Sequence, residues 1–128
     1  MFVSSTGQLG IRPSSARYKR DIAPLDAHSQ GLFQLRPVTF RYTQDPQGER
    51  QYGLIAEEVA TVYPELVTRG ATGEVEAVRY EALVPLLLHA LQHQQRQVAE
   101  LQAQNAAFAA RLAQLEAAVA RTAALASR

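Results

Sequence analysis

The spacing of apolar residues changes once along the chain, near Glu81. After that point apolar side chains recur at alternating intervals of three and four positions. The recurring residues are Leu87, Leu91, Val98, Leu101, Phe108, Leu112, Leu115 and Val119. This spacing places them on one stripe of a helix. The sequence therefore predicts a long helix over residues 85–128, with Pro85 in its first turn, where a missing N–H costs nothing.

The stripe follows a coiled-coil heptad for about five repeats, more than the three to four that usually indicate one. With Leu91 at position a and Leu87 at d, Asn105 falls at a, where a polar side chain costs stability and fixes register. Arg111 at g and Glu116 at the following e are placed to pair between parallel chains. A single helix leaves the stripe unburied, so we expect an oligomer. The periodicity leaves dimer and trimer both open.

The residues before the long helix mix short helices and strands. Asp26 is a candidate N-cap for a short helix carrying the apolar positions 32–35, which Pro37 stops. Residues 38–42 alternate apolar and polar side chains, which predicts a strand, and turn chemistry after them predicts a returning strand at 52–55.

A second helix and a hairpin are expected next. Residues 57–63 are predicted to be helical, and Pro64 ends that helix. Its apolar stripe consists of Ile55, Val59 and Val62. Residues 66–68, returning as 75–80 around two glycines, predict a hairpin. The expected fold class is α+β: a small mixed helix and strand domain over 14–84, followed by a C-terminal helix over 85–128 that forms a parallel coiled coil.

The first thirteen residues read as a short extended piece with a turn at Thr6 and Gly7. They are too few to bury a core, so we interpret residues 1–13 as a remnant of an upstream fibre or as a tag.

Composition narrows the classes of function. Thirteen Lys and Arg against twelve Asp and Glu give a formal net charge of +1, which offers no global attraction to nucleic acid or an anionic membrane. There is no cysteine, which excludes disulfides and thiolate metal sites. No apolar run is long enough to span a bilayer, and the first residues do not begin a signal peptide. We expect no nucleic-acid partner, no membrane partner and no secretion by a signal peptide.

The three histidines do not indicate a metal site. His89 and His93 stand four apart, a spacing that two ligands can use, but the heptad puts them at f and c on the outward face. No third ligand lies near them in sequence, so we interpret them as a solvated pair. His28 lies alone in the first short helix. No metal and no cofactor is expected.

A serine and a lysine stand five apart in the segment SSARYK. Lys19 can act as general base for Ser14 if burial or nearby cations lower its pKa, and Arg17 and Arg20 are close enough in sequence to contribute. The same cations are a weak signal for phosphate binding. On spacing alone, a solvated polar segment is the better explanation of these residues.

Five segments in order resemble one known family. They are PSSARYKRDI, LRPVTFRY, YGLIAEEVATVYPELV, VRYEALVPLLLHALQ and the Gln-rich helix that follows. In order and spacing they are similar to the C-terminal intramolecular chaperone domain of endosialidase tailspikes and related phage fibres, which also occurs in the myelin regulatory factor. The resemblance covers about residues 12–100.

The resemblance implies a homotrimer that assists assembly of an upstream fibre or tailspike domain of the same precursor. It implies release by a single self-cleavage with a Ser–Lys dyad, so that the chain would be a self-cleaving serine endopeptidase. Carried over, the nucleophile is Ser14, the base is Lys19 and the scissile bond is Pro13–Ser14. Ser15 is the fallback nucleophile, one position short of the family spacing. The expected location is the phage virion tail, or the bacterial host cytoplasm during assembly.

Two other functions remain open. The first is a non-cleaving trimerisation module that stays as a permanent fibre tip, which the fixed φ of Pro13 beside the attacked carbonyl favours. The second is a coiled-coil DNA-binding factor. Its basic residues lie far upstream of the long helix, whereas a zipper protein has them contiguous with it.

Overall fold

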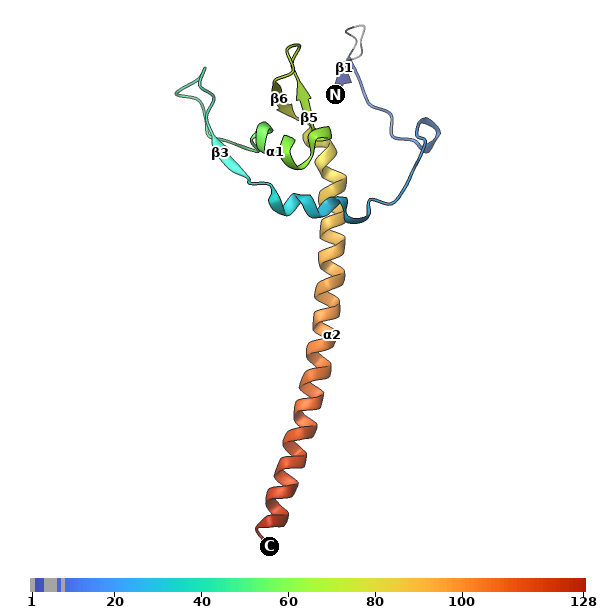
Figure 1. Ribbon diagram of the computed structural model, residues 1–128, viewed down its shortest axis with the longest axis vertical. Coiled ribbons are helices and arrows are strands. Elements are labelled where there is room, and N and C mark those ends of the chain that lie inside the picture. The colour runs from blue at the N-terminus through green and yellow to red at the C-terminus, as the bar shows by residue number, and fades with distance from the viewer. Residues whose placement is uncertain (1, 4–6, 8) are drawn as a thin grey trace.

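The computed structural model describes residues 2–3, 7 and 9–128 of the chain. A single helix, α2 (Tyr80–Ala126), forms a rod of 47 residues, about 70 Å long at 1.5 Å per residue. Short helices and hairpins gather at the N-terminal end of this rod (Figure 1). The chain is therefore α+β with a long C-terminal helix, as the sequence predicts.

Among the described residues, no helix combines the length and the apolar character needed to cross a bilayer.

Helix α2 begins earlier than predicted. Its first residue is Tyr80, so Pro85 lies inside the helix rather than in the first turn, and that prediction was wrong. Pro85 removes one helical hydrogen bond, but packing outweighs the loss. Leu83 and Leu86 are buried in the core on either side of it, and Tyr80 Oη accepts the N–H of Leu54 at 2.9 Å.

The strands form separate two-stranded antiparallel hairpins. They are β1 (Phe2–Val3) with β2 (Leu9–Gly10), β3 (Val38–Phe40) with β4 (Gln51–Gly53), and β5 (Val67–Arg69) with β6 (Val75–Val78). The two hairpins predicted after residue 37 are confirmed, although β3 ends two residues early. Phe40 and Tyr42 still share one face, where their rings meet edge to face at 5.2 Å. Of the predicted turn at Thr6 and Gly7, Thr6 lies outside the described residues.

The first short helix differs from the prediction in kind and in cap. It is a 3₁₀ helix, η2 (Asp26–Gln34), with Leu25 as the preceding cap residue and no side-chain cap. Asp26 is not the N-cap. It is the first helical residue and has φ of 48°, a left-handed conformation that Asp tolerates better than most residues. Its backbone therefore lacks the extended geometry that an N-cap needs.

The core forms where α1 (Ala56–Val62), the 3₁₀ turn η3 (Pro64–Leu66) and the first turns of α2 meet. Its buried residues are Val59, Tyr63, Leu66, Val67, Leu83 and Leu86. Val59 lies at the centre and is 1% exposed, and Val62 packs against the core, but Ile55, the third residue of the predicted stripe, is 36% exposed. The core is small, and it seats the domain against one side of α2.

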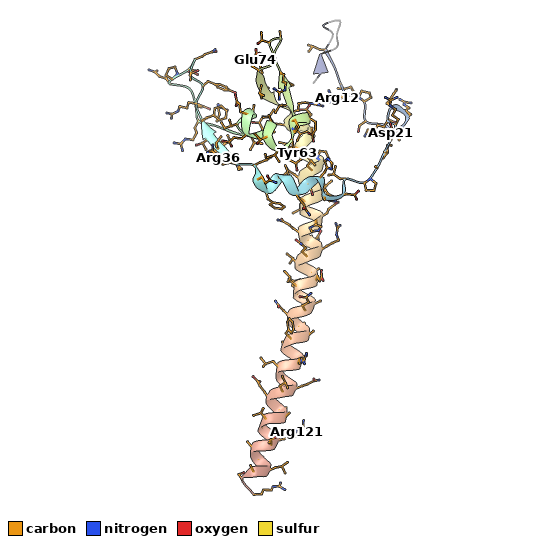
Figure 2. All side chains as sticks on the ribbon, in the orientation of Figure 1. Arg12, Asp21, Arg36, Tyr63, Glu74 and Arg121 are labelled. Carbon is orange, nitrogen blue, oxygen red and sulfur yellow. The ribbon has the colours of Figure 1, made fainter. Side chains whose placement is uncertain are left out.

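Helix η2 is held to this core through Tyr63 and Gly31. The Tyr63 hydroxyl donates a hydrogen bond to the carbonyl oxygen of His28 in η2. A Cβ on Gly31 would lie 2.7 Å from Tyr63 Cζ and Oη, so the two elements approach as closely as a glycine allows. Figure 2 shows Tyr63 at this junction beside α2. Because η2 crosses α2, the segments before and after η2 extend to opposite sides of α2 (Figure 1).

Candidate functional site

The predicted serine and lysine lie next to each other in space. A single 3₁₀ turn, η1 (Ala16–Tyr18), separates them and folds the chain back through two backbone hydrogen bonds of 3.0 Å, Tyr18 N to Ser15 O and Lys19 N to Ala16 O. Lys19 Nζ donates a hydrogen bond to Ser14 Oγ at 3.1 Å. This distance is within the range that proton transfer between a nucleophile and a base requires.

Both side chains stand in solvent. Every residue from 9 to 22 is exposed, including Ser14 and Lys19. Arg17 stacks over the ring of Tyr18, 4.7 Å from its centroid, and Arg20 pairs with Asp21 at 3.7 Å. The segment therefore supplies the pair and its cationic surroundings, but within one chain it supplies no cover that excludes water.

The arrangement can perform one kind of chemistry when it is covered. A lysine becomes a base where burial and neighbouring cations favour its neutral form. Ser14 Oγ can then attack the carbonyl carbon of Pro13 through a five-membered ring that contains Oγ, Cβ, Cα, N and the carbonyl carbon. The hydroxyl proton passes to Lys19, the C–N bond breaks, and the Ser14 nitrogen takes a proton as it leaves. Water then hydrolyses the ester.

A second feature of possible function is the apolar stripe of α2, which remains uncovered along its whole length. Side chains at the a and d positions from Val84 to Val119 are each between 52% and 68% exposed. They belong to Val84, Leu87, Leu91, Val98, Leu101, Phe108, Leu112, Leu115 and Val119. Each would contribute about 1.5–3 kcal/mol if it were fully buried.

The small domain does not cover the apolar side chains of this stripe. The buried α2 residues Leu83 and Leu86 fall at heptad positions g and c, away from a and d. Helix η2 packs beside His89, Ala90, His93, Gln94 and Gln97, of which only Gln94 lies at an a or d position. The fold therefore covers one side of the helix and leaves the apolar side chains at a and d exposed from Val84 to Val119, about ten turns of the helix.

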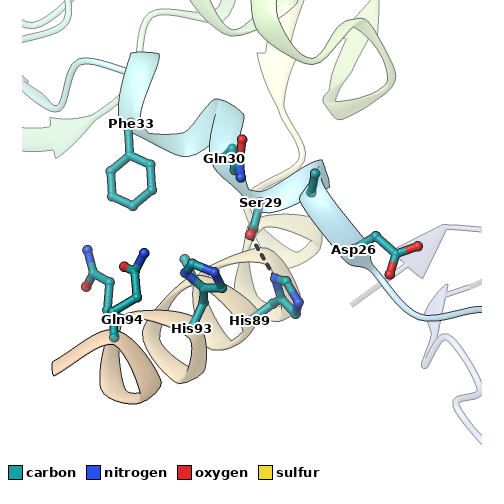
Figure 3. A pocket seen from close by; sticks show the side chains of 10 residues that line it. Asp26, Ser29, Gln30, Phe33, His89, His93 and Gln94 are labelled. Carbon is teal, nitrogen blue, oxygen red and sulfur yellow. Dashed lines mark hydrogen bonds between the residues drawn. The ribbon is translucent and has the colours of Figure 1, made fainter. Parts of the chain in front are cut away.

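His89 departs from the expectation of a solvated pair. Its Nδ1 is hydrogen-bonded to Ser29 Oγ at 2.8 Å, and Ser29 is only 4% exposed (Figure 3). Helix η2 covers the outward face of α2 at this level, which the heptad pattern alone treats as solvent. His93 stays exposed and lines the same pocket, of about 390 Å³. The partner of His89 lies 60 positions away, so no local signal in the sequence could have indicated it.

The expectation that the histidines bind no metal stays a prediction. Within the described part of the chain, no three His, Cys, Asp or Glu side chains lie together so as to hold an ion.

Shifted pKa values occur at groups that hold the small domain together. A hydrogen bond to Glu58 raises the pKa of Arg36 and ties the end of η2 to α1. A hydrogen bond from Thr72 lowers the pKa of Glu74 in the β5–β6 turn. Burial raises the pKa of Tyr63. These three groups serve the fold of the domain.

Residues 14–68 match the model of a family described as chaperone of endosialidase, which carries the family name Peptidase S74. This match supports the resemblance to the endosialidase chaperone domain that the five sequence segments indicate. The chaperone-of-endosialidase segment begins at Ser14 and includes Lys19, η2, the β3–β4 hairpin and α1. It ends within β5, so the match is shorter than the resemblance over residues 12–100 and does not include α2. No curated protein matches the chain significantly.

Proposed function

We propose that this protein is an intramolecular trimerisation chaperone of a phage-type tailspike or tail fibre. In this proposal three copies associate through α2 and assist the assembly of an upstream domain of the same precursor. The domain then releases itself by cutting the Pro13–Ser14 bond, with Ser14 as nucleophile and Lys19 as base. It acts in the bacterial host cytoplasm during assembly or in the virion tail.

The observation that carries this proposal is the pair at the first residue of the family match. The chaperone-of-endosialidase segment begins at Ser14, and Lys19 Nζ lies 3.1 Å from Ser14 Oγ. The family name includes a peptidase, and self-cleavage at Ser14 would release a piece that begins where the match begins. Lys19 is the proposed base for this serine.

The exposed stripe of α2 supports association of copies. An uncovered apolar surface of this length is unfavourable in water, and a parallel partner helix in the same register would bury it. The number three follows from the family resemblance. Assembly also explains why the Ser14–Lys19 pair is exposed in a single chain, because a cut that depends on assembly leaves an unassembled chain intact.

The test is to express the protein with its natural upstream region and to determine intact mass and N-terminal sequence. We expect a fragment whose first residue is Ser14. Ser14→Ala and Lys19→Ala should each abolish that fragment, while both variants still assemble. A full-length product from the unmodified precursor, with unchanged assembly, would remove the proteolytic part of the proposal.

A non-cleaving trimerisation module is the alternative. It is favoured by Pro13, whose ring restricts φ beside the attacked carbonyl, and by the exposure of the pair. The substitution Pro13→Ala in the same precursor separates the two functions. If the proline blocks cleavage, Pro13→Ala yields the Ser14 fragment and the unmodified precursor does not.

A further inference from the structure

Residues 16–22, hereafter the basic segment, present a cationic and apolar surface that their own chain leaves uncovered. Tyr18 is 59% exposed and Ile22 is 70% exposed. The Arg17 guanidinium lies over one face of the Tyr18 ring, so the aromatic surface already carries a positive charge. Lys19 and Arg20 add two further cations, and Asp21, which lies 3.7 Å from Arg20, offsets one of them, so that the segment keeps a net positive charge. An exposed surface of this kind fits an apolar groove with acidic walls.

The domain has such a groove on another element. It lies between the β3–β4 hairpin, the start of α1 and β6, and has a volume of about 310 Å³. Phe40, Ile55, Val78 and Tyr80 supply apolar walls, and Glu57 and Glu76 supply exposed carboxylates. We call it the acidic groove. Its charge is opposite to that of the basic segment.

Within one chain the two surfaces point away from each other. The nine residues of η2 stand between them, about 18 Å of 3₁₀ helix. The basic segment and the β3–β4 hairpin extend to opposite sides of α2 (Figure 1). Figure 2 shows the same separation, with Asp21 on one side of α2 and Arg36, at the end of η2, on the other.

A cyclic assembly brings such surfaces together. Identical protomers can be related by rotation about an axis parallel to α2. A surface on one side of each protomer then faces the surface on the opposite side of the next protomer. Contacts of this head-to-tail kind close into a ring. The basic segment of each copy then faces the acidic groove of the next.

We propose that the basic segment docks into the acidic groove of a second copy of this chain. Arg17 and Arg20 pair with the partner's Glu57 and the partner's Glu76, and Tyr18 and Ile22 cover apolar walls. This inference rests on the proposed parallel assembly of α2. It adds a second interface between protomers, next to the Ser14–Lys19 pair.

Disulfide cross-linking tests the docking directly, because the chain contains no cysteine of its own. In the double variant Ala16→Cys/Ala77→Cys, one cysteine lies at the start of the basic segment and the other in the acidic groove. Mild oxidation should give covalent oligomers up to trimers on a denaturing gel. The matched control is Ala16→Cys/Thr61→Cys, which places the second cysteine on another exposed side of α1 and should stay monomeric on the gel.

Charge reversal tests the pairing. Adding Glu57→Arg and Glu76→Arg to the cross-linking variant should lower the cross-linked fraction about tenfold, because like charges then face each other. Adding Arg17→Glu and Arg20→Glu as well should restore it. All four side chains are exposed, and circular dichroism checks that the variants are folded.

Sedimentation of the same samples separates this inference from the proposed function. Trimers by sedimentation with no cross-link between positions 16 and 77, or with a link inside one chain only, overturn the docking and leave the trimerisation intact. Monomers by sedimentation overturn both. Cross-linked trimers that release no Ser14 fragment support the docking and remove the proteolysis.

Discussion

Lys19 is the residue on which the proposed chemistry depends most directly. Its Nζ contacts Ser14 Oγ, and a base must lose its proton to act. Lys19→Arg keeps the charge and most of the reach, but a guanidinium does not lose its proton in proteins. We therefore predict that Lys19→Arg lowers the rate of cleavage at Pro13–Ser14 at least about 100-fold. The measurement is the appearance of the Ser14 fragment over time by mass spectrometry.

Ser15→Ala is the matched control for this prediction. Ser15 neighbours the nucleophile and is equally exposed, but its hydroxyl is not the one that Lys19 contacts. The control should cleave at the rate of the unmodified precursor. If Ser15→Ala abolished the cut and Ser14→Ala did not, the nucleophile would be Ser15 and the assignment of Ser14 would be wrong.

Tyr63 sets a pH dependence of stability. Burial raises its pKa in the folded chain, so folding favours the neutral phenol. Its contribution is fully present below a pH of about 10, the ordinary value for tyrosine, and is lost as pH rises through the raised folded value. Tyr63→Phe removes the hydrogen bond to His28 O and should cost about 1 kcal/mol at neutral pH.

Urea unfolding of both proteins near pH 7 and above about pH 10 measures this effect. The unmodified protein should lose more stability than Tyr63→Phe over that interval, so the two curves approach each other. Equal losses in both proteins would show that another group causes the alkaline destabilisation.

The residues of the candidate site differ in how well the sequence reveals them. Ser14 and Lys19 are joined by five positions of chain, and a local turn is enough to bring them into contact. The bond between His89 and Ser29 spans 60 positions and depends on how η2 crosses α2. Such a contact is decided by tertiary packing, which neither the heptad pattern nor the spacing of histidines contains.

Gly31 controls the packing of η2 on the core. A Cβ at this position would lie 2.7 Å from the Tyr63 ring and 2.9 Å from Val62 Cγ1, so the elements must move apart. We predict that Gly31→Ala destabilises the domain by about 1–3 kcal/mol. Gly10→Ala is the control, because nothing lies within 4 Å of its Cβ position. Equal melting temperatures of the two variants would contradict this role of Gly31.

At the scale of elements, patterns with many repeats predicted structure better than single marker residues. The stripe around Val59 gave α1, and the alternation after residue 37 gave β3 with its hairpin partner. Asp26 and Pro85 were misread as end markers, of η2 and α2 respectively. At both positions, neighbouring apolar residues pack in or against the core. This packing makes the helix begin before the position that the marker residue predicts.

At the scale of the whole molecule, the proposed assembly depends on the exposed stripe of α2. Leu101 and Leu112 lie at d and a in the middle of the stripe and are 56% and 57% exposed. The double variant Leu101→Asp/Leu112→Asp places charges in the proposed interface, where burial without partners costs several kcal/mol. We predict that this variant is monomeric, as measured by size-exclusion chromatography with light scattering.

The control variant carries the same charges on the outer face. Ala103→Asp/Ala110→Asp changes two f positions and should leave the oligomer unchanged. An oligomer that survives the changes at Leu101 and Leu112 would place the interface elsewhere on the molecule. The sequence predicts that α2 needs partners, but the number of copies depends on side-chain packing between helices and does not follow from the period.

Sedimentation equilibrium of the unmodified chain tests the central claim most directly. The proposed chaperone role, the proposed assembly-dependent cut and the proposed docking of the basic segment all require parallel assembly through α2. The account predicts a particle of three times 14.1 kDa that does not dissociate at micromolar concentration. A monomer of 14.1 kDa would contradict it.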